Sequence, residues 1–335
     1  MRCLYTGSVS MLVALSVLMG GGCATREEPH TTFRTGDYSK FLEKQKARTS
    51  VAEEMDKNLP EMTAEEYEMA GDNAFRQGNV SVAFVQYDKA QRMAPTKLSL
   101  RYKKGLVFLK KGLAEDALHV FQDILSTDNA FAAAYEGIGH ALLIKGDIRE
   151  AEKHFHRALA FDASLWKSHN ALGMIYDHQG RFDEAVVSYN EAIALNNNSG
   201  ALFNNLGVSY HRRGDYNNAV HAFLKALNMG YVEAKVHNNL GLCLAKLGRY
   251  REALTVFTKG GDKSRAYNNI GVIYLTEGKH AEATAAFEQA MALSSRYYTT
   301  ASENLRIAQQ TRGASPSNLD IPSLSSGNRE AQPVQ

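Results

Sequence analysis

The sequence has little proline, little cysteine and almost no net charge. These shortages favour a helical chain and disfavour an internal disulfide and nucleic-acid binding. Only six of the 335 residues are proline, while 44% are hydrophobic and 22% are charged, a balance that favours a globular and mainly helical chain with a sizeable core. The formal net charge is +2, and basic residues are mixed with acidic ones along the chain. Because no long-range field of one sign attracts polyanions, nucleic-acid binding is not expected.

The sequence also lacks the residue spacings that catalysis and cofactor binding require. It contains no phosphate-binding loop, no dinucleotide-binding fingerprint and no metal-ligand spacing. His154 and His156 are two residues apart, which places them on different faces of a helix and disfavours a shared metal ion. We therefore predict a protein that is not an enzyme and has no cofactor and no metal. The alternative, a remnant of an enzyme domain, is disfavoured because nothing after residue 312 could host one.

Residues 1–22 are laid out as a secretory signal peptide, with a cation at Arg2, an apolar run over Met11–Met19 and three glycines before Cys23. As a helix the apolar run would span only about 14 Å, about half of the hydrocarbon core of a bilayer, which disfavours an uncleaved anchor. Cys23 after small residues resembles the lipobox of bacterial lipoproteins, in which the cysteine is acylated and becomes the mature N-terminus. Gly20 departs from that pattern, because these lipoproteins usually carry leucine there.

The remaining cysteines agree with this interpretation. Cys3 would leave with the signal peptide and Cys23 would carry lipid, so Cys243 has no partner for an internal disulfide. Cys243 stands among apolar residues of an expected helix, and we interpret it as a core residue and not as a nucleophile. Residues 23–63 are predicted to form a polar linker that begins at the lipidated cysteine, and residues 313–335, rich in Ser, Pro, Asn and Gln, are predicted to be disordered.

A repeat of 34 residues runs through the middle of the chain. Glycines stand at positions 71, 105, 139, 173, 207 and 241, and the series continues at 271 after a step of 30. Each is followed seven residues later by a second glycine, five residues after that by an alanine, and four residues further on by Tyr or Phe. The first glycine allows two helices to approach closely, and the second ends the first helix at a turn with positive φ. The alanine and its aromatic partner form an apolar stripe on a second helix.

This pattern resembles the tetratricopeptide repeat over residues 64–297, as seven repeats of one helical hairpin each. The resemblance implies an all-α fold, a right-handed superhelical solenoid. Thr63–Glu66 has the pattern of a capping box that starts the first helix, and residues 298–312 are predicted to form a helix that caps the last repeat. Two departures are local: Arg101 and Lys104 replace apolar residues in repeat two, and the stretch KGGDKS ends the second helix of repeat six early.

The predicted binding site lies on the first helix of each repeat, opposite the side that carries the repeat signature. With the first glycine of a repeat at position 8 and about 100° per residue, positions 2, 5, 6, 9 and 13 are expected to face a concave groove. In repeats four to seven these positions carry amides, apolar residues and cations. The predicted groove residues are Lys167, Asn170, Met174, Asn204, Asn205, Val208, Lys235, Asn238, Asn239, Leu242, Arg265, Asn268, Asn269 and Val272.

A ladder of amides can satisfy the backbone of an extended peptide, because each amide offers both donors and an acceptor, while the apolar residues at position 9 accept alternate side chains. We therefore predict a groove for peptide segments, and the cations at position 2 favour some carboxylate character in the ligand. The alternative is that some of the asparagines only bond the neighbouring helix and support the fold. The carboxylate clamp of chaperone-binding repeats is not expected, because only Lys235 and Arg265 match it.

The order of signal peptide, cysteine, linker, repeat array and polar tail resembles the repeat-containing lipoproteins of the tight-adherence (Flp) pilus machinery, and it is also similar to the pilotin lipoproteins of type IV pili. With Ala24 and Thr25 after the cysteine in place of aspartate, the resemblance implies a scaffold that is lipid-anchored at the periplasmic face of the outer membrane. Its protein partners would be the outer-membrane secretin or other pilus-assembly components. An adaptor for peptidoglycan hydrolases or periplasmic proteases is the alternative.

Overall fold

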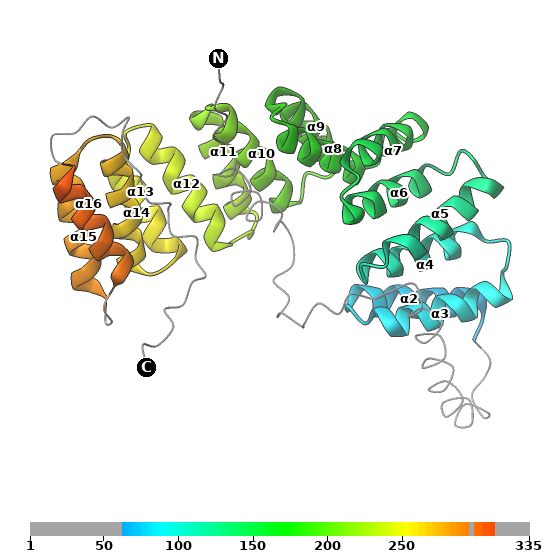
Figure 1. The fold of residues 1–335 in the computed structure, drawn as a ribbon. Coiled ribbons are helices and arrows are strands. Elements are labelled where there is room, and N and C mark those ends of the chain that lie inside the picture. The colour runs from blue at the N-terminus through cyan, green and yellow to red at the C-terminus, as the bar shows by residue number, and fades with distance from the viewer. Residues whose placement is uncertain (1–61, 295–297, 312–335) are drawn as a thin grey trace, which may run out of the picture. The chain divides into compact units, whose positions relative to one another are not determined.

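The computed structural model describes residues 62–294 and 298–311, and every regular element within these ranges is an α-helix (Figure 1). The helices are α2 (Ala64–Arg76), α3 (Val80–Met93), α4 (Leu98–Lys110), α5 (Ala114–Thr127), α6 (Ala132–Lys145), α7 (Ile148–Phe161), α8 (Trp166–Gln179), α9 (Phe182–Leu195), α10 (Gly200–Arg213), α11 (Tyr216–Asn228), α12 (Ala234–Lys246), α13 (Tyr250–Gly260), α14 (Lys263–Thr276), α15 (His280–Leu293) and α16 (Thr299–Gln310). None of these helices has the length and apolar character that a membrane span requires. The predicted signal peptide, the lipidated Cys23, nearly all of the linker and the predicted tail lie outside the described residues.

Consecutive helices pair into helical hairpins, from α2 with α3 to α14 with α15. We call the first helix of each pair the A helix and the second the B helix. Each B helix also packs on the A helix of the following repeat, so the hairpins stack in chain order, and α16 packs on α15 as one more A helix would. The prediction of an all-α solenoid of tetratricopeptide repeats is confirmed for the described part of the chain.

The first glycine of each repeat makes room for the aromatic ring of the paired B helix. In repeat six, a Cβ atom placed on Gly241 would lie 2.5 Å from the ring of Phe257. That ring is buried, and so is Ala253 one helical turn before it. Because a side chain on Gly241 would collide with the ring, the two helices could not approach as closely with any other residue there. The predicted role of the first glycine is confirmed.

The second glycine of each repeat makes the turn between the A and B helices. Gly146 follows α6 with φ 85°, in the left-handed region. Its backbone N–H donates to the carbonyl oxygen of Leu143 at 3.1 Å, and the N–H of Asp147 donates to that of Leu142 at 2.9 Å. These bonds use carbonyl groups that the end of the helix leaves without partners, and glycine is the residue that adopts this conformation without strain. The predicted turn is confirmed.

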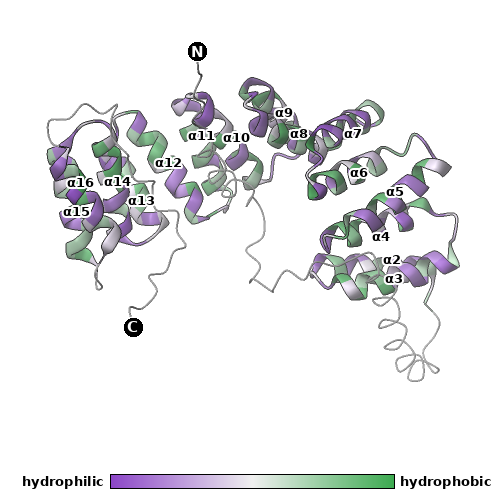
Figure 2. Ribbon diagram, viewed as in Figure 1, coloured by the Kyte–Doolittle hydropathy of each residue, from purple (hydrophilic) through white to green (hydrophobic). Residues whose placement is uncertain are grey.

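The hydrophobic core crosses the boundaries between repeats. Phe223 of α11 packs in one cluster with Val236 and Leu240 of α12, and Phe155 of α7 packs with Leu172 of α8. Figure 2 shows that the helices carry hydrophobic residues on part of their surface and hydrophilic residues on the rest. Because one hairpin cannot bury its apolar side alone, each repeat depends on its neighbours for stability.

The first and last described helices are closed by local contacts. The hydroxyl of Thr63 accepts from the backbone N–H of Glu66 at 3.2 Å, and the Glu66 carboxylate accepts from the N–H of Thr63 at 2.7 Å. These two bonds are the predicted capping box. At the other end, Ala308 of α16 joins a cluster with Val272 and Phe287, so α16 covers apolar side chains that the last repeat would otherwise expose.

The two departures from the repeat pattern are accommodated locally. Arg101 forms an ion pair with Asp123 at 3.0 Å, and Lys104 forms one with Asp88 at 2.8 Å. The Lys104 ammonium also lies 5.1 Å from the centre of the Phe84 ring, a cation–π contact in place of an apolar one. In repeat six, α13 has 11 residues and ends at Gly260, as the KGGDKS stretch predicts.

We expect Gly207→Ala to destabilise the array by about 1–3 kcal/mol, because its new methyl group overpacks the core. A Cβ atom at this position would lie 2.7 Å from the ring of Phe223. Gly261→Ala is the matched control, because its backbone is extended and no atom lies within 4 Å of the added Cβ. Urea midpoints of the two variants measure the effect, and equal midpoints would show that the aromatic ring does not require the glycine.

Candidate functional site

Two pairs of neighbouring A helices, α2 with α4 and α8 with α10, are joined through positions 5 and 6. Asn205 Nδ2 at position 6 of α10 donates to Asn170 Oδ1 at position 5 of α8, at 3.1 Å. Lys103 Nζ at position 6 of α4 donates to Glu68 Oε1 at position 5 of α2, at 2.7 Å. The same two positions therefore join A helices in both halves of the array, with an amide pair in one half and an ion pair in the other.

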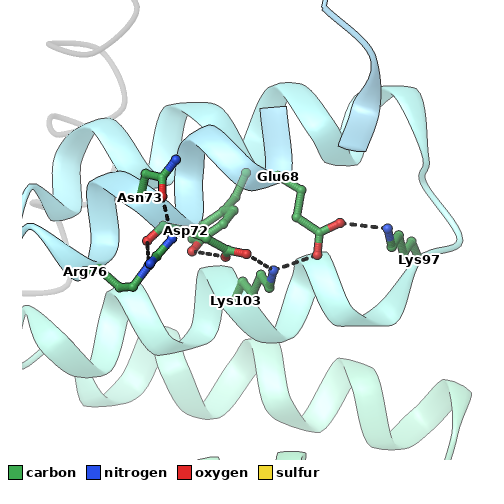
Figure 3. Close-up of polar contacts among 7 residues, drawn as sticks. Glu68, Asp72, Asn73, Arg76, Lys97 and Lys103 are labelled. Carbon is green, nitrogen blue, oxygen red and sulfur yellow. Dashed lines mark hydrogen bonds and ion pairs between the residues drawn. The ribbon is translucent and has the colours of Figure 1, made fainter. Parts of the chain in front are cut away.

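An ion-pair network that the sequence analysis missed links α2 and α4 (Figure 3). The Glu68 carboxylate accepts from Lys97 and from Lys103, each at 2.7 Å, and Lys103 also pairs with Asp72 at 2.7 Å. The hydroxyl of Tyr87 donates to Asp72 at 2.8 Å. The charges of Glu68 and Asp72 are thus offset by Lys97 and Lys103. A lysine at position 6 one repeat after a glutamate at position 5 was the signal that could have revealed it.

The lysines of this network lower the pKa of Glu68. Burial by itself raises the pKa of the carboxyl, but the hydrogen bonds from Lys103 and Lys97 outweigh burial and hold the pKa below its ordinary value. In repeat three, the position 5 residue is Glu136, which is buried and accepts a hydrogen bond from Ser168 Oγ at 2.8 Å. Burial raises the pKa of Glu136, and it outweighs the hydrogen bond from Ser168 and the nearby charge of Lys167, which lower it.

The amide ladder is partly open and partly enclosed. Four of its asparagines are half-buried, namely Asn170, Asn205, Asn238 and Asn239. Three are buried, namely Asn204, Asn268 and Asn269. Besides the bond between Asn205 and Asn170, Asn204 Nδ2 contacts Asn205 Oδ1 at 3.4 Å. The asparagines of repeats four and five therefore form a connected group. This agrees with the alternative interpretation of the sequence, in which some of the asparagines only bond the neighbouring helix and support the fold.

In repeat seven the prediction that Asn268, Asn269 and Val272 face a ligand groove is wrong. Asn268 is 0% exposed and Val272 is 3% exposed, and Asn269 is buried beside them. The reason is α16: its Asn304 Nδ2 donates to Asn268 Oδ1 at 2.9 Å, and its apolar residues pack on Val272. A helical wheel gives the direction of a side chain but not the helix that covers it.

In repeat five the prediction is wrong for Asn204, which is 5% exposed. Its helix, α10, lies between α8 and α12, and both neighbours contact it. Asn204 Oδ1 is buried and accepts no hydrogen bond from another described residue. This oxygen is therefore stabilised neither by water nor by a hydrogen bond within the fold. The enclosed position follows from the packing of α8, α9, α11 and α12 around α10 and not from the sequence of one helix.

The other predicted groove residues remain accessible. At position 9, Met174 is 38% exposed, and Val208 and Leu242 are half-buried. At position 2, Lys167 and Arg265 are exposed, and Lys235 is half-buried and pairs with Glu233 at 2.9 Å. The candidate surface therefore extends over α8, α10 and α12 and ends at Arg265. We call it the A-helix surface: Lys167, Asn170, Met174, Asn205, Val208, Lys235, Asn238, Asn239, Leu242 and Arg265.

A cysteine and a histidine lie together but do not form a nucleophilic pair. Cys243 Sγ is 3.3 Å from His211 Nδ1. The thiol is fully buried, and burial raises the pKa of Cys243 to about 12, so the thiol stays protonated. Burial also lowers the pKa of His211, which favours the neutral ring. The interpretation of Cys243 as a core residue is confirmed. Within the described ranges, no group of three or more His, Cys, Asp or Glu residues could hold a metal ion.

Comparison with known proteins identifies the family. Models of the tetratricopeptide repeat match residues 68–135, 204–260 and 264–297, and a TPR repeat model matches residues 175–214. The chain belongs to the tetratricopeptide repeat family, whose members use the surfaces of stacked hairpins to bind protein or peptide partners. No curated protein matches the sequence.

Several solved structures are similar to this chain. The structure of the APC/C hetero-tetramer Cut9–Hcn1 is 21% identical with a TM-score of 0.51, and the match covers 80% of this chain and 52% of that one. A tetratricopeptide repeat protein from Parabacteroides merdae is 16% identical with a TM-score of 0.45, covering 73% and 98% of the two chains. YrrB, described as a TPR protein with an unusual peptide-binding site, is 20% identical with a TM-score of 0.47, covering 56% and 97%.

Asn268→Ala and Asn239→Ala separate the structural asparagines from those of the A-helix surface. Asn268→Ala leaves the buried amide of Asn304 without its acceptor, which should cost about 1–3 kcal/mol of stability. Asn239 is half-buried and makes no hydrogen bond with another described residue, so its replacement should change stability by less than about 0.5 kcal/mol. Thermal denaturation measures both. A loss for Asn239→Ala as large as that for Asn268→Ala would mean that repeat six also uses its amides for the fold.

Proposed function

We propose that this protein is a scaffold that binds extended peptide segments of partner proteins on the A-helix surface, and that a lipid on Cys23 holds it at the periplasmic face of the outer membrane. The observation that carries the binding proposal is the set of half-buried amides, Asn205, Asn238 and Asn239, which border the apolar side chains of Val208 and Leu242. Hydrogen-bonding groups that still reach solvent can exchange water for a ligand.

The spacing of the A helices suits an extended chain. Packed helices lie about 8–10 Å apart, and an extended peptide advances about 3.3 Å per residue, so about three peptide residues cross each repeat. The amides can pair with peptide N–H and C=O groups regardless of sequence, and Met174 and its counterparts at position 9 can contact apolar side chains. Affinity would then come from the backbone, and selectivity from the neighbouring apolar and charged residues.

The cellular setting rests on the sequence. The signal peptide and the cysteine at residue 23 support secretion and lipidation, and the order of segments resembles the lipoproteins of the Flp pilus and the pilotins of type IV pili. Under this proposal the partner is an outer-membrane secretin or another pilus-assembly component, and the scaffold assists its assembly at the membrane.

Cys23→Ser tests the anchor, because serine cannot be acylated at the site where the lipobox resemblance places the lipid. We expect the variant to move from the membrane fraction to the soluble periplasmic fraction, while the parent chain stays with the membrane. Fractionation followed by immunoblotting measures the distribution. Tight membrane association of the variant would place the anchor elsewhere in the chain.

In-cell crosslinking tests the scaffold and its partner. Affinity-tagged protein is crosslinked, purified and subjected to mass spectrometry, with Asn205→Ala/Asn239→Ala in parallel. Asn190→Ala/Asn217→Ala is the matched control, because both of these asparagines are exposed on B helices. We expect the parent and the control to capture secretin or pilus components. The Asn205→Ala/Asn239→Ala variant should capture at least about fivefold less of them, because it loses two hydrogen bonds to the ligand of about 0.5–1.5 kcal/mol each.

The other outcomes of this experiment are also informative. Capture of peptidoglycan hydrolases or proteases in place of pilus components would assign the protein to the alternative adaptor role. Capture that the Asn205→Ala/Asn239→Ala variant leaves unchanged would mean that these amides serve the fold and that partners bind elsewhere.

A further inference from the structure

Charge is segregated between the two kinds of helix in repeats four to seven. The A helices α8, α10, α12 and α14 contain one acidic residue, Asp177, and seven basic ones: Lys167, Arg212, Arg213, Lys235, Lys246, Lys263 and Arg265. The B helices α9, α11, α13 and α15 contain three basic residues and six acidic ones: Asp183, Glu184, Glu191, Glu252, Glu282 and Glu288. The small net charge of the chain hides this difference.

Asp177, the acidic residue of these A helices, does not lie on their surface. Its side chain is buried and accepts a hydrogen bond from the hydroxyl of Tyr189 at 3.0 Å. Burial raises the pKa of Asp177 and outweighs the hydrogen bond from Tyr189 and the nearby charge of Arg212, which both lower it. The surface of these four helices is therefore cationic, and no acidic side chain of the same helices lies on it.

Five of these cations are exposed and form no ion pair with a carboxylate among the described residues, namely Lys167, Arg212, Lys246, Lys263 and Arg265. Arg212 does donate a hydrogen bond to the backbone carbonyl oxygen of Asp177 at 2.9 Å. The state of the five cations contrasts with repeats one and two, where Lys97 and Lys103 are neutralised by acidic residues of α2 (Figure 3). Because these cations form no direct ion pair within the described part of the chain, they remain available for a carboxylate of another molecule. Lys167 and Arg212 interact only at longer range with the buried carboxylates of Glu136 and Asp177.

Four of these five cations lie along the two edges of the A-helix surface, and Lys263 is the first residue of α14. Lys167 and Arg265 occupy position 2, near the start of α8 and α14, whereas Arg212 and Lys246 occupy position 13, at the end of α10 and α12. Eleven residues of helix separate the two positions by about 16 Å along the helix axis. The amides and the apolar position 9 residues lie between these edges. A ligand that fits must present apolar groups in the middle and negative charge toward the edges.

We infer that the peptide held by the A-helix surface is acidic, an extended segment in which carboxylate side chains reach the cations of both edges and apolar side chains contact Met174, Val208 and Leu242. The inference rests on the proposed peptide-binding function. An anionic membrane or a nucleic acid would satisfy the cations, but neither would use the apolar residues and amides between them. Charge complementarity together with this central strip therefore favours an acidic protein segment.

Three synthetic probes test the chemistry of the ligand. They are fluorescein-labelled 12-residue peptides made of four Leu-Ser-Glu, Leu-Ser-Gln or Leu-Ser-Lys units, because a three-residue unit matches about one repeat. Fluorescence anisotropy with the full chain measures their dissociation constants. We expect the Glu peptide to bind at least about tenfold more tightly than the Gln peptide, the Lys peptide to bind least, and the preference to shrink as salt is raised.

Two matched variants assign the preference to the surface. Lys167→Gln/Arg212→Gln/Lys246→Gln/Arg265→Gln removes the four edge cations, and Arg149→Gln/Lys225→Gln/Arg251→Gln/Lys259→Gln removes four exposed cations of B helices. Each exposed charge pair changes affinity about 1.4- to 5-fold, so the loss of four pairs should weaken binding of the Glu peptide at least about fourfold. The second variant, with the same net charge, should bind like the parent. Circular dichroism confirms that both remain helical.

The outcomes separate the inference from the function on which it rests. Equal affinity for the Glu and Gln peptides, unchanged in the first variant, would overturn the acidic ligand and leave peptide binding intact. Failure of all three peptides to bind would count against the peptide-binding function itself. Binding to phosphatidylglycerol vesicles that the first variant loses and that the Glu peptide does not displace would assign the cations to a membrane surface instead.

Discussion

The array depends on the contact between one aromatic ring and one glycine in every repeat. Where the ring of Phe257 lies against Gly241, the A and B helices approach to a distance at which a single added carbon atom would collide with the ring. This close approach determines the geometry of each hairpin. Because the contact recurs at a 34-residue step, successive hairpins present equivalent apolar surfaces and share a core across their boundaries.

The opposite side of the A helices takes no part in this contact, so its chemistry differs along the chain. Lys103 and Glu68 join α4 to α2 through an ion pair, and Asn205 and Asn170 join α10 to α8 through amides at the same two positions. An ion pair uses the charge of both partners, whereas each amide has more than one donor and acceptor. The same helix contact therefore offsets charge in repeats one and two, and it leaves hydrogen-bonding capacity beside exposed cations such as Lys167 in the later repeats.

Most of the fold could be predicted, because its determinants are close in sequence. The turn at Gly146, the buried pair of Ala253 and Phe257, and the capping box at Thr63 each depend on residues within one or two helical turns of each other. The candidate site was harder. The helical wheel placed the side chain of Asn268 on the correct side of α14, but it could not show that α16 covers that side.

The sequence by itself determined the repeat, the close approach of the helices within each hairpin and the residue types on the A helices, because these depend on local periodicity and on the size of single side chains. Only the tertiary structure decided which of those residues remain accessible. Asn239 is half-buried and Asn269 is buried, although both occupy position 6 of an A helix. The physical reason is that exposure depends on the placement of neighbouring helices, and α16 packs over the last repeat and not over repeat six.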